Sequence, residues 1–306
     1  MSVLVHKLYQ RAALAATTLC LPMALHAAPA VSLTAVELLG GTDPAGVTDV
    51  IGGYASGGDF YYANSTGDNA SFFHTYGDTG SLASFGARTS GTGTWYTRTS
   101  ATYTDSYTNS SGSAQTVVFS FYVDGGQIGL SGSGRGYADL ALNLSFNGST
   151  VASEHGRVEQ TAAGVVSCSD SGTGVLASYM ACGASDAASI YSAGTGYSVG
   201  YTLAAGETLS VVYEILATTS GEAMDVSGAE LYCDGFLETF AVEVGQEPGQ
   251  GGSCAWFNGL ARSGDPAGFM PSAGFSLTAQ NVPEPGSLLL AATAALGLLA
   301  TRRRRA

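Results

Sequence analysis

The stretch 31–281, which we call the body, contains no lysine and only five arginines. It carries 23 aspartates and glutamates, which leaves a net charge of −18. Such a surface cannot neutralise a row of phosphates, and an anionic lipid surface repels it, so nucleic acid and anionic membranes are excluded as its partners. Helix-forming aliphatic residues are sparse, which disfavours a helical bundle. Disorder is disfavoured too, because a chain that is 45% apolar can bury a core.

Nucleotide-binding motifs are also missing, since no G-x-G-x-x-G or Walker-type loop occurs. The one G-x-S-x-G match runs from Gly196 to Gly200. A nucleophile elbow needs a strand, a sharp turn and then a helix, whereas Ser198 sits inside an alternating, strand-like pattern. Both histidines of the body, His74 and His155, precede it, and the usual order of that fold puts histidine last. We therefore expect no enzymatic activity, and a secreted hydrolase is the weakest alternative.

The N-terminus is typical of a secretory signal. Lys7 and Arg11 form its basic start, and the apolar run 12–25 follows. That run is shorter than the ~20 residues that a membrane span needs. Cleavage is expected after one of three small residues, Ala27, Ala28 or Ala30. We assign residues 1–28 to a helical signal peptide that directs export.

The C-terminal stretch 282–306 combines three features in a fixed order. It starts with a Pro-Glu-Pro motif, formed by Val282, Pro283, Glu284 and Pro285. The next stretch, 287–301, is apolar and as a helix would span about 22 Å, short of the ~30 Å hydrocarbon core of a bilayer. Four basic residues follow, Arg302, Arg303, Arg304 and Arg305. Because arginines beside a membrane segment stay cytoplasmic, the tail predicts a short membrane helix that leaves the body outside.

This order of features resembles the PEP-CTERM sorting signal of Gram-negative bacteria. In that family an exosortase, which is a membrane cysteine transpeptidase, recognises the tail, and Glu284 with its flanking prolines corresponds to the recognition element. The resemblance implies export across the inner membrane, transient anchoring through 287–301, and a final location at the cell surface, in the outer envelope or outside the cell. Family members usually accompany exopolysaccharide and biofilm systems, so exopolysaccharide is an expected partner. The resemblance implies nothing about the fold or activity of the body.

Four cysteines follow the signal peptide, Cys168, Cys182, Cys233 and Cys254. An even number in an exported chain favours disulfides, and four cysteines allow three pairings. We expect Cys168 to pair with Cys182 and Cys233 with Cys254, because each bond closes a short loop and removes roughly 3 kcal/mol of unfolded-chain freedom. A zinc site is disfavoured, because no pair has C-x-x-C spacing and the two histidines lie far away in sequence.

Apolar and polar residues alternate along much of the body, which is typical of half-buried strands. We expect strands over 94–104, 116–123, 137–146, 151–158, 197–203, 208–217, 236–244 and 275–280. Turn signals occur at 43–46, 109–112, 124–126, 147–148, 205–206 and 265–268. The body shows no convincing helical period. We therefore predict an all-β, antiparallel and jelly-roll-like β-sandwich over 31–281, as one large domain or two small ones.

The acidic balance and the exported setting leave calcium binding open, although no cofactor is expected. A dense calcium loop places carboxylates two residues apart, and no two acids of the body are adjacent or two apart. Four residues of Gly-rich stretches could converge from separate turns, namely Asp59, Asp68, Asn69 and Asp78. Solvated turn residues are the simpler explanation.

Two further groups have both a functional and a structural explanation. Glu154, His155 and Arg157 form a small polar stretch, and a strand that places His155 and Arg157 on one face would bring them together without any function. An early aromatic cluster could form a sugar-stacking surface or fill the core. Its members are Tyr54, Phe60, Tyr61, Tyr62, Phe72, Phe73 and Tyr76.

These observations rank three functions. The first is a non-enzymatic exported surface or extracellular-matrix protein, sorted through its tail and associated with exopolysaccharide. The second is a carbohydrate-binding module or adhesin that acts on exopolysaccharide. The third is a secreted hydrolase. Expected partners are an exosortase, exopolysaccharide, and the membrane that holds 287–301 before processing.

Overall fold

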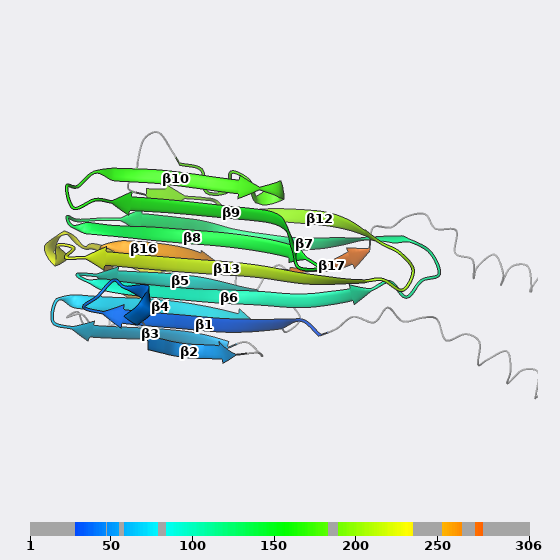
Figure 1. Cartoon of the computed structure of the whole chain (residues 1–306), viewed down its shortest axis with the longest axis horizontal. Coiled ribbons are helices and arrows are strands. Elements are labelled where there is room, and N and C mark those ends of the chain that lie inside the picture. The colour runs from blue at the N-terminus through cyan, green and yellow to red at the C-terminus, as the bar shows by residue number, and fades with distance from the viewer. Residues whose placement is uncertain are drawn as a thin grey trace, which may run out of the picture.

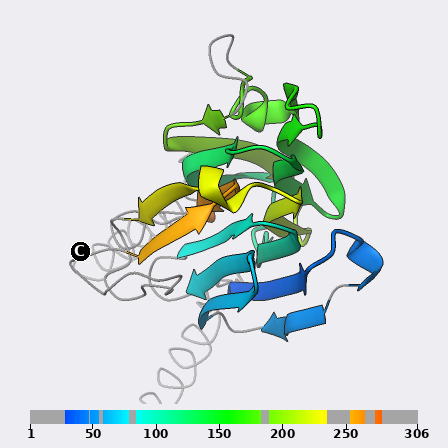
Figure 2. The ribbon, with the colours of Figure 1, turned by 90° about the vertical axis from the view of Figure 1, so that its left-hand side faces the viewer.

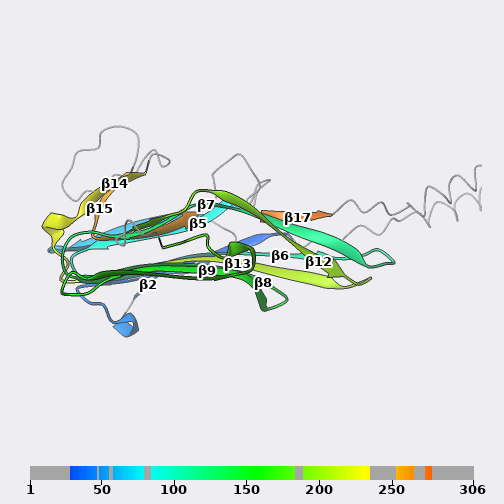
Figure 3. The same cartoon turned by 90° about the horizontal axis from the view of Figure 1, so that it is seen from above.

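The computed structural model describes residues 28–46, 48–54, 58–78, 84–182, 189–234, 253–264 and 273–277. Over these residues the chain is all-β, and two large antiparallel sheets pack face to face, as Figures 1 and 3 show. The expected all-β, antiparallel architecture is confirmed. No helix in the described residues is long and apolar enough to cross a membrane. The expected signal helix and membrane helix fall on 1–27 and 278–306, outside the described residues.

The first sheet has seven strands in the order β10-β9-β8-β13-β6-β1-β2. These strands are β10 (Val166–Thr173), β9 (Ser149–Gln160), β8 (Arg135–Phe146), β13 (Thr208–Glu222), β6 (Trp95–Thr108), β1 (Ala30–Leu39) and β2 (Thr48–Tyr54). Figure 2 looks along the strands and shows β10 in green at one side of the sandwich and β1 and β2 in blue at the other.

The second sheet has eight strands, six of them in the order β11-β7-β16-β5-β4-β3. These six are β11 (Ser189–Tyr191), β7 (Gln115–Leu130), β16 (Gly259–Gly264), β5 (Ser84–Thr92), β4 (Asn69–Asp78) and β3 (Gly58–Thr66). The other two, β12 (Thr195–Leu203) and β17 (Ala273–Leu277), also pair with β7. Although the predicted turn at 205–206 joins β12 to β13, these strands lie in different sheets, so the chain crosses the sandwich there.

Strand β7 corrects one expectation. A turn was expected at 124–126, but the strand runs through these residues. Its first part pairs with β12 and β17 and its second part with β11 and β16. A Cβ atom on Gly126 would lie 2.7 Å from Sδ of Met180 and 3.0 Å from Tyr179. The glycine therefore permits close packing beside a change of strand partners, and local sequence cannot distinguish this role from a turn.

The predicted turn between β8 and β9 is confirmed. Asn147 and Gly148 have φ angles of 49° and 78°, both in the left-handed region that a two-residue type I′ hairpin requires. Asn147 also contacts β13, because its side-chain oxygen accepts a hydrogen bond from the backbone N–H of Ser210 at 2.8 Å. The turn at 43–46 is present as well, as the short 3-10 helix η1 (Pro44–Gly46), whereas 265–268 lies outside the described residues.

The core is built by inward-facing alternate residues of both sheets. In β8 the side chains of Leu140, Leu142 and Leu144 are fully buried, as the alternation predicts. Aromatic rings join the two sheets, since Phe85 of β5 stacks on Tyr103 of β6 at 5.5 Å. Phe119 of β7 packs edge-to-face on Phe146 at 6.2 Å. This aromatic layer supplies much of the apolar contact between the sheets.

Trp95 anchors one end of the sandwich. It is fully buried, and its ring occupies space left by three glycines on three different strands, Gly91, Gly221 and Gly259. Its indole N–H donates a hydrogen bond to the hydroxyl of Thr219 at 3.0 Å. A side chain on any of these glycines would collide with the ring, so the glycines provide close packing around the tryptophan.

Candidate functional site

A polar cluster lies on the outer face of β8 and β9. Strand register places Asp139 opposite Arg157 and Ala141 opposite His155. Asp139 is the shared partner, because one of its oxygens lies 2.8 Å from Nε2 of His155 and 3.4 Å from a guanidinium nitrogen of Arg157. The side chain of Asp139 is only 15% exposed, whereas that of His155 is 43% exposed. Of these two side chains, the histidine is therefore the more accessible to a ligand.

Arg157 organises the rest of the cluster. Its Nε donates a hydrogen bond to Glu159 at 3.2 Å, and its guanidinium lies 3.9 Å from the ring centre of Tyr137. Burial raises the pKa of Tyr137 to about 12, and repulsion from Tyr96 adds to this effect. The tyrosine hydroxyl therefore stays protonated at neutral pH and can donate hydrogen bonds. The cluster thus presents hydrogen-bonding groups of both signs on a flat sheet face.

The expected polar stretch is divided between the two faces of β9. His155 and Arg157 point outward, whereas Glu154 is buried between the sheets and only 1% exposed. Alternation along a strand accounts for this division, because neighbouring residues point to opposite faces. Asp139, which completes the outer cluster, lies 16 positions from His155. Sequence reasoning missed Asp139, since only the pairing of β8 with β9 brings it there.

A second basic row was also missed by the sequence analysis. His74, Arg88 and Arg262 lie opposite one another on the neighbouring strands β4, β5 and β16. They are three of the seven histidines and arginines in the body. Arg88 stacks over the ring of Phe72 at 5.0 Å, and Arg262 donates to the side chain of Gln127. Directly opposite residues in a sheet lie side by side, so the row gathers three basic residues on neighbouring strands.

The early aromatic residues divide between core and surface. Phe72 and Phe73 are buried, and Phe60 packs against the core. Tyr62 is 39% exposed and stacks on Phe73 at 5.6 Å, and Tyr76 stacks on His74 at 5.2 Å. The side chains of Tyr54 and Tyr61 lie outside the described residues. A continuous sugar-stacking platform is therefore not formed by the described members, because most of them support the fold.

The residues considered for calcium do not come together. Strands β3 and β4 form a hairpin with Asp68 and Asn69 at its closed end, and the strand register places Asp59 and Asp78 at its open end. Asn69 has a structural contact, since its side-chain oxygen accepts the backbone N–H of Thr94 at 2.8 Å. Within the described residues, no group of three or more His, Cys, Asp and Glu side chains could hold a metal ion.

Ser198 of the G-x-S-x-G match lies inside β12. Its hydroxyl shares a hydrogen bond with the hydroxyl of Ser120 on β7 at 3.0 Å. A nucleophile elbow places its serine on a sharp turn between a strand and a helix. Ser198 instead belongs to one of several cross-strand hydroxyl pairs, and further along the same two strands Thr116 pairs with Thr202 at 3.2 Å.

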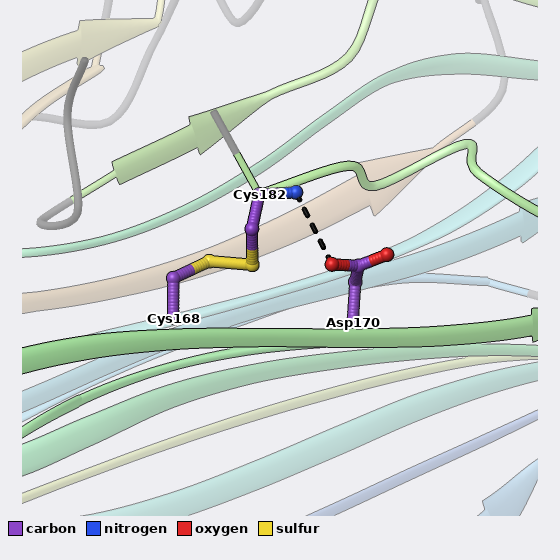
Figure 4. The surroundings of a disulfide bond; sticks show 3 residues. All are labelled: Cys168, Asp170 and Cys182. Carbon is purple, nitrogen blue, oxygen red and sulfur yellow. Dashed lines mark hydrogen bonds between the residues drawn. A yellow bond between two sulfur atoms is a disulfide. The ribbon is translucent and has the colours of Figure 1, made fainter. Parts of the chain in front are cut away.

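One of the two expected disulfides is confirmed. Cys168 on β10 bonds to Cys182, with the Cα atoms 5.9 Å apart. Figure 4 shows Cys168 and Asp170 pointing from β10 toward Cys182, whose backbone N–H donates to Asp170 at 3.4 Å. The other pair, Cys233 and Cys254, occupies directly opposite positions in the hairpin of β14 (Glu230–Asp234) and β15 (Ser253–Phe257). Their side chains are not described, so the second bond stays a prediction.

Comparison with known proteins identifies one element of the chain. Residues 281–305 match the PEP-CTERM protein-sorting motif. No curated protein and no solved structure matches the chain. The resemblance of the tail is thereby confirmed, and the motif implies an exported protein that an exosortase processes and that is sorted to the cell surface. The motif residues, including Pro283, Glu284 and Pro285, lie outside the described residues.

Proposed function

We propose that this chain is a non-enzymatic protein of the cell surface or extracellular matrix, associated with exopolysaccharide. The observation that carries the proposal is the PEP-CTERM motif at 281–305. The tail 282–306 serves as a temporary anchor in the inner membrane, and its removal delivers the body to the outer envelope or the medium. The sheet topology of the body also supports the jelly-roll-like expectation in one respect, because the neighbouring strands β13-β8-β9-β10 have the strand order of a Greek key.

The surface of the body suits an exported protein. Hydroxyl pairs link neighbouring strands on its outer faces, among them Thr108 with Thr208 at 2.8 Å and Ser153 with Thr173 at 2.9 Å. These pairs satisfy polar side chains without adding charge. The net charge of −18 keeps copies apart and soluble outside the cell.

A triple substitution tests the sorting step. Replacing Pro283, Glu284 and Pro285 together with alanine in a host that has an active exosortase should leave the protein in the inner-membrane fraction. The matched control replaces Asp43 and Pro44, which lie in an exposed turn far from the tail in sequence, with alanine and should be processed normally. Normal release of the tail variant would refute recognition through the motif.

A carbohydrate-binding module or adhesin is the second candidate, and the outer face of β8 and β9 favours it. Asp139, His155, Arg157 and Glu159 offer hydrogen-bonding groups. The facing residues of β10 add hydroxyls such as Ser169, which lies opposite Arg157. Sugar hydroxyls pair with groups of this kind. On an array of purified glycans, saturable binding by the wild type that is lost in Asp139→Asn and kept in Ser210→Ala would promote this candidate.

A secreted hydrolase ranks third. Its support is the G-x-S-x-G match alone, and the hydroxyl of Ser198 is engaged with Ser120 within paired strands. A screen of ester and glycoside substrates against the purified body tests it. Turnover that disappears in Ser198→Ala would reverse the ranking.

A further inference from the structure

One short segment closes the side of the sandwich next to β10. It runs from Gly174 to Cys182, begins with the 3-10 helix η2 (Gly174–Leu176), and we call it the strap. Figure 1 places it beside β10 and β9 at the edge of the molecule. Leu176 and Met180 of the strap are fully buried, and Tyr179 is 6% exposed. The strap therefore contributes side chains to the space between the two sheets.

The strap contacts both sheets at once. Met180 fits between two glycines, since a Cβ on Gly156 of β9 would lie 3.0 Å from its Cβ and a Cβ on Gly126 of β7 would lie 2.7 Å from its Sδ. The hydroxyl of Tyr179 accepts a hydrogen bond from the backbone N–H of Gly126 at 2.7 Å. The ring of Tyr179 also packs edge-on against Tyr197 of β12 at 6.4 Å. The strap thus bridges β9 in one sheet to β7 and β12 in the other.

A covalent bond holds the far end of the strap. The Cys168–Cys182 disulfide joins its last residue to the inward-facing side of β10 (Figure 4). Without this bond, the burial of three large side chains must offset the loss of conformational entropy when nine residues become ordered. Loss of backbone entropy is the main cost of folding. Ser178 adds to that cost, because its φ of 71° is left-handed and unfavourable for a residue with a side chain. The bond therefore adds a covalent constraint to the noncovalent contacts that hold the strap.

A buried carboxylate lies directly beneath the strap. Glu154 of β9 is 1% exposed, and within the described residues neither of its side-chain oxygens makes a hydrogen bond of full geometry. Gly172 leaves room for it, because a Cβ there would collide with the carboxylate. Burial raises the pKa of Glu154, and the nearby backbone N–H groups of Ser178, Tyr179 and Met180 offset this only in part.

Ionised Glu154 therefore favours an open strap. The charged groups facing it are few: Asp170 of β10 repels it, and its charge in turn disfavours ionisation of Tyr197 on β12. Burial raises the pKa of Tyr179 to about 12, so this strap residue stays neutral at physiological pH. In the closed state the protonated form of Glu154 is favoured, and closure weakens as pH rises through its raised pKa.

We propose that the Gly174–Cys182 strap is a redox-released closure of the sandwich. A thiol reductant cleaves the Cys168–Cys182 bond, the two sulfurs each gain one hydrogen, and two reductant thiols become one disulfide. The strap then leaves the gap between the sheets and exposes Glu154 together with the apolar surface that Leu176 and Met180 covered. The two sheets remain packed on each other, because ring contacts such as Phe85 with Tyr103 and Phe119 with Phe146 join them without any strap residue.

Limited proteolysis of the exported protein with chymotrypsin tests the release. Cleavage after Leu176, Tyr179 or Met180 requires an open strap, and mass spectrometry locates each cut. We expect dithiothreitol to raise the rate of these cuts by at least about tenfold, because the rate follows the population of the open strap and that population should rise by the same factor. The far-ultraviolet circular dichroism spectrum should stay unchanged. The Cys168→Ser/Cys182→Ser variant should match the reduced wild type without reductant.

A cysteine control assigns the effect to the right bond. Cys233→Ser/Cys254→Ser should resist cleavage in the strap until dithiothreitol is added. Unchanged strap cleavage in the reduced wild type would overturn the proposal. Loss of the β spectrum together with cleavage throughout the body would overturn it as well, because opening would then be global unfolding.

The pH dependence tests the role of Glu154 in the same assay. Strap cleavage in the reduced wild type, normalised to a free peptide of the same sequence, should be faster at pH 8 than at pH 5. Glu154→Gln keeps the shape of the side chain without the charge and should remove this difference. If Glu154→Gln retains the full pH dependence of strap cleavage, another group causes that dependence, and the proposed role of Glu154 in strap opening is overturned.

Discussion

The body and the tail of this protein encode their roles in different ways. The tail relies on a short run of residues in fixed order, and residues 281–305 alone suffice to identify the sorting motif. The body relies on contacts between strands far apart in sequence, such as those that surround Trp95 with glycines from β5, β13 and β16. Substitutions in the body should therefore change stability and leave sorting intact, whereas those in the motif should do the reverse.

The largest loss of stability is expected at Trp95. Trp95→Ala removes a fully buried ring from a close-packed glycine pocket and should cost about 3–5 kcal/mol of unfolding free energy. Urea denaturation of the processed protein measures it. Tyr62→Ala, which removes an aromatic side chain that is 39% exposed, serves as the control and should cost much less. Equal losses in the two variants would contradict the assigned core.

The next largest effect is expected at the disulfide. Cys168→Ser/Cys182→Ser frees a loop with a sequence separation of 14 residues and should lower the unfolding free energy by roughly 3 kcal/mol in the chain-entropy model. The urea midpoint of the variant, compared with that of the oxidised wild type, measures this loss. A midpoint equal to that of the wild type would mean that the bond constrains nothing in the unfolded chain.

A smaller and pH-dependent effect is expected at Glu154. Burial raises the pKa of this carboxyl above the ordinary value of 4.5, so the folded state resists its ionisation. Wild-type stability should begin to fall as pH rises past about 4.5, and the fall should be complete above the raised pKa. Glu154→Gln should flatten this part of the curve. Urea midpoints of both proteins between pH 4 and pH 8 measure this dependence. If the midpoints of the wild type and of Glu154→Gln change with pH in the same way, the raised pKa of Glu154 is contradicted.

The smallest effect is expected on the outer face of β8 and β9. The side chain of Arg157 is 31% exposed, and its ion pairs with Asp139 and Glu159 are open to solvent screening. Arg157→Ala should therefore cost no more than about 1 kcal/mol. A thermal melt at low and high salt measures this. A loss of several kcal/mol would mean that the cluster supports the fold, which would weaken the case for a binding surface.

The strands from β6 to β9 and the pair β12 and β13 were predictable from sequence, because alternation and turn residues act locally, whereas β1 to β5 were not predicted. The Asn147-Gly148 turn followed from its residue types, and the Cys168–Cys182 bond was the favoured one of three pairings because it closes a short loop. Gly126 was misread as part of a turn, since its role depends on strap residues more than 50 positions away. The His155–Asp139 contact likewise depends on strand register, which no local pattern specifies.

The division of Glu154 from His155 shows the same limit at one position. Alternation predicts that the two residues face opposite ways, yet it does not say which face is buried. That choice is made by β7 and the strap, which cover the inner face of β9. Likewise, the four residues considered for calcium are separated by the register of the β3–β4 hairpin rather than by their sequence spacing. Asp59 and Asp78 lie at its open end, and Asp68 and Asn69 lie at its closed end.

The intact mass of the processed protein tests the central claim most directly. The wild-type chain is expressed with and without an active exosortase, and the mature protein is purified from the cell surface and the medium. We expect a mass that lacks residues from the cut near Val282–Pro285 onward when the exosortase is present, and a membrane-bound form with Arg302–Arg305 when it is absent. A mature protein that keeps its arginines beside an active exosortase would contradict the sorting account and make the tail a permanent anchor.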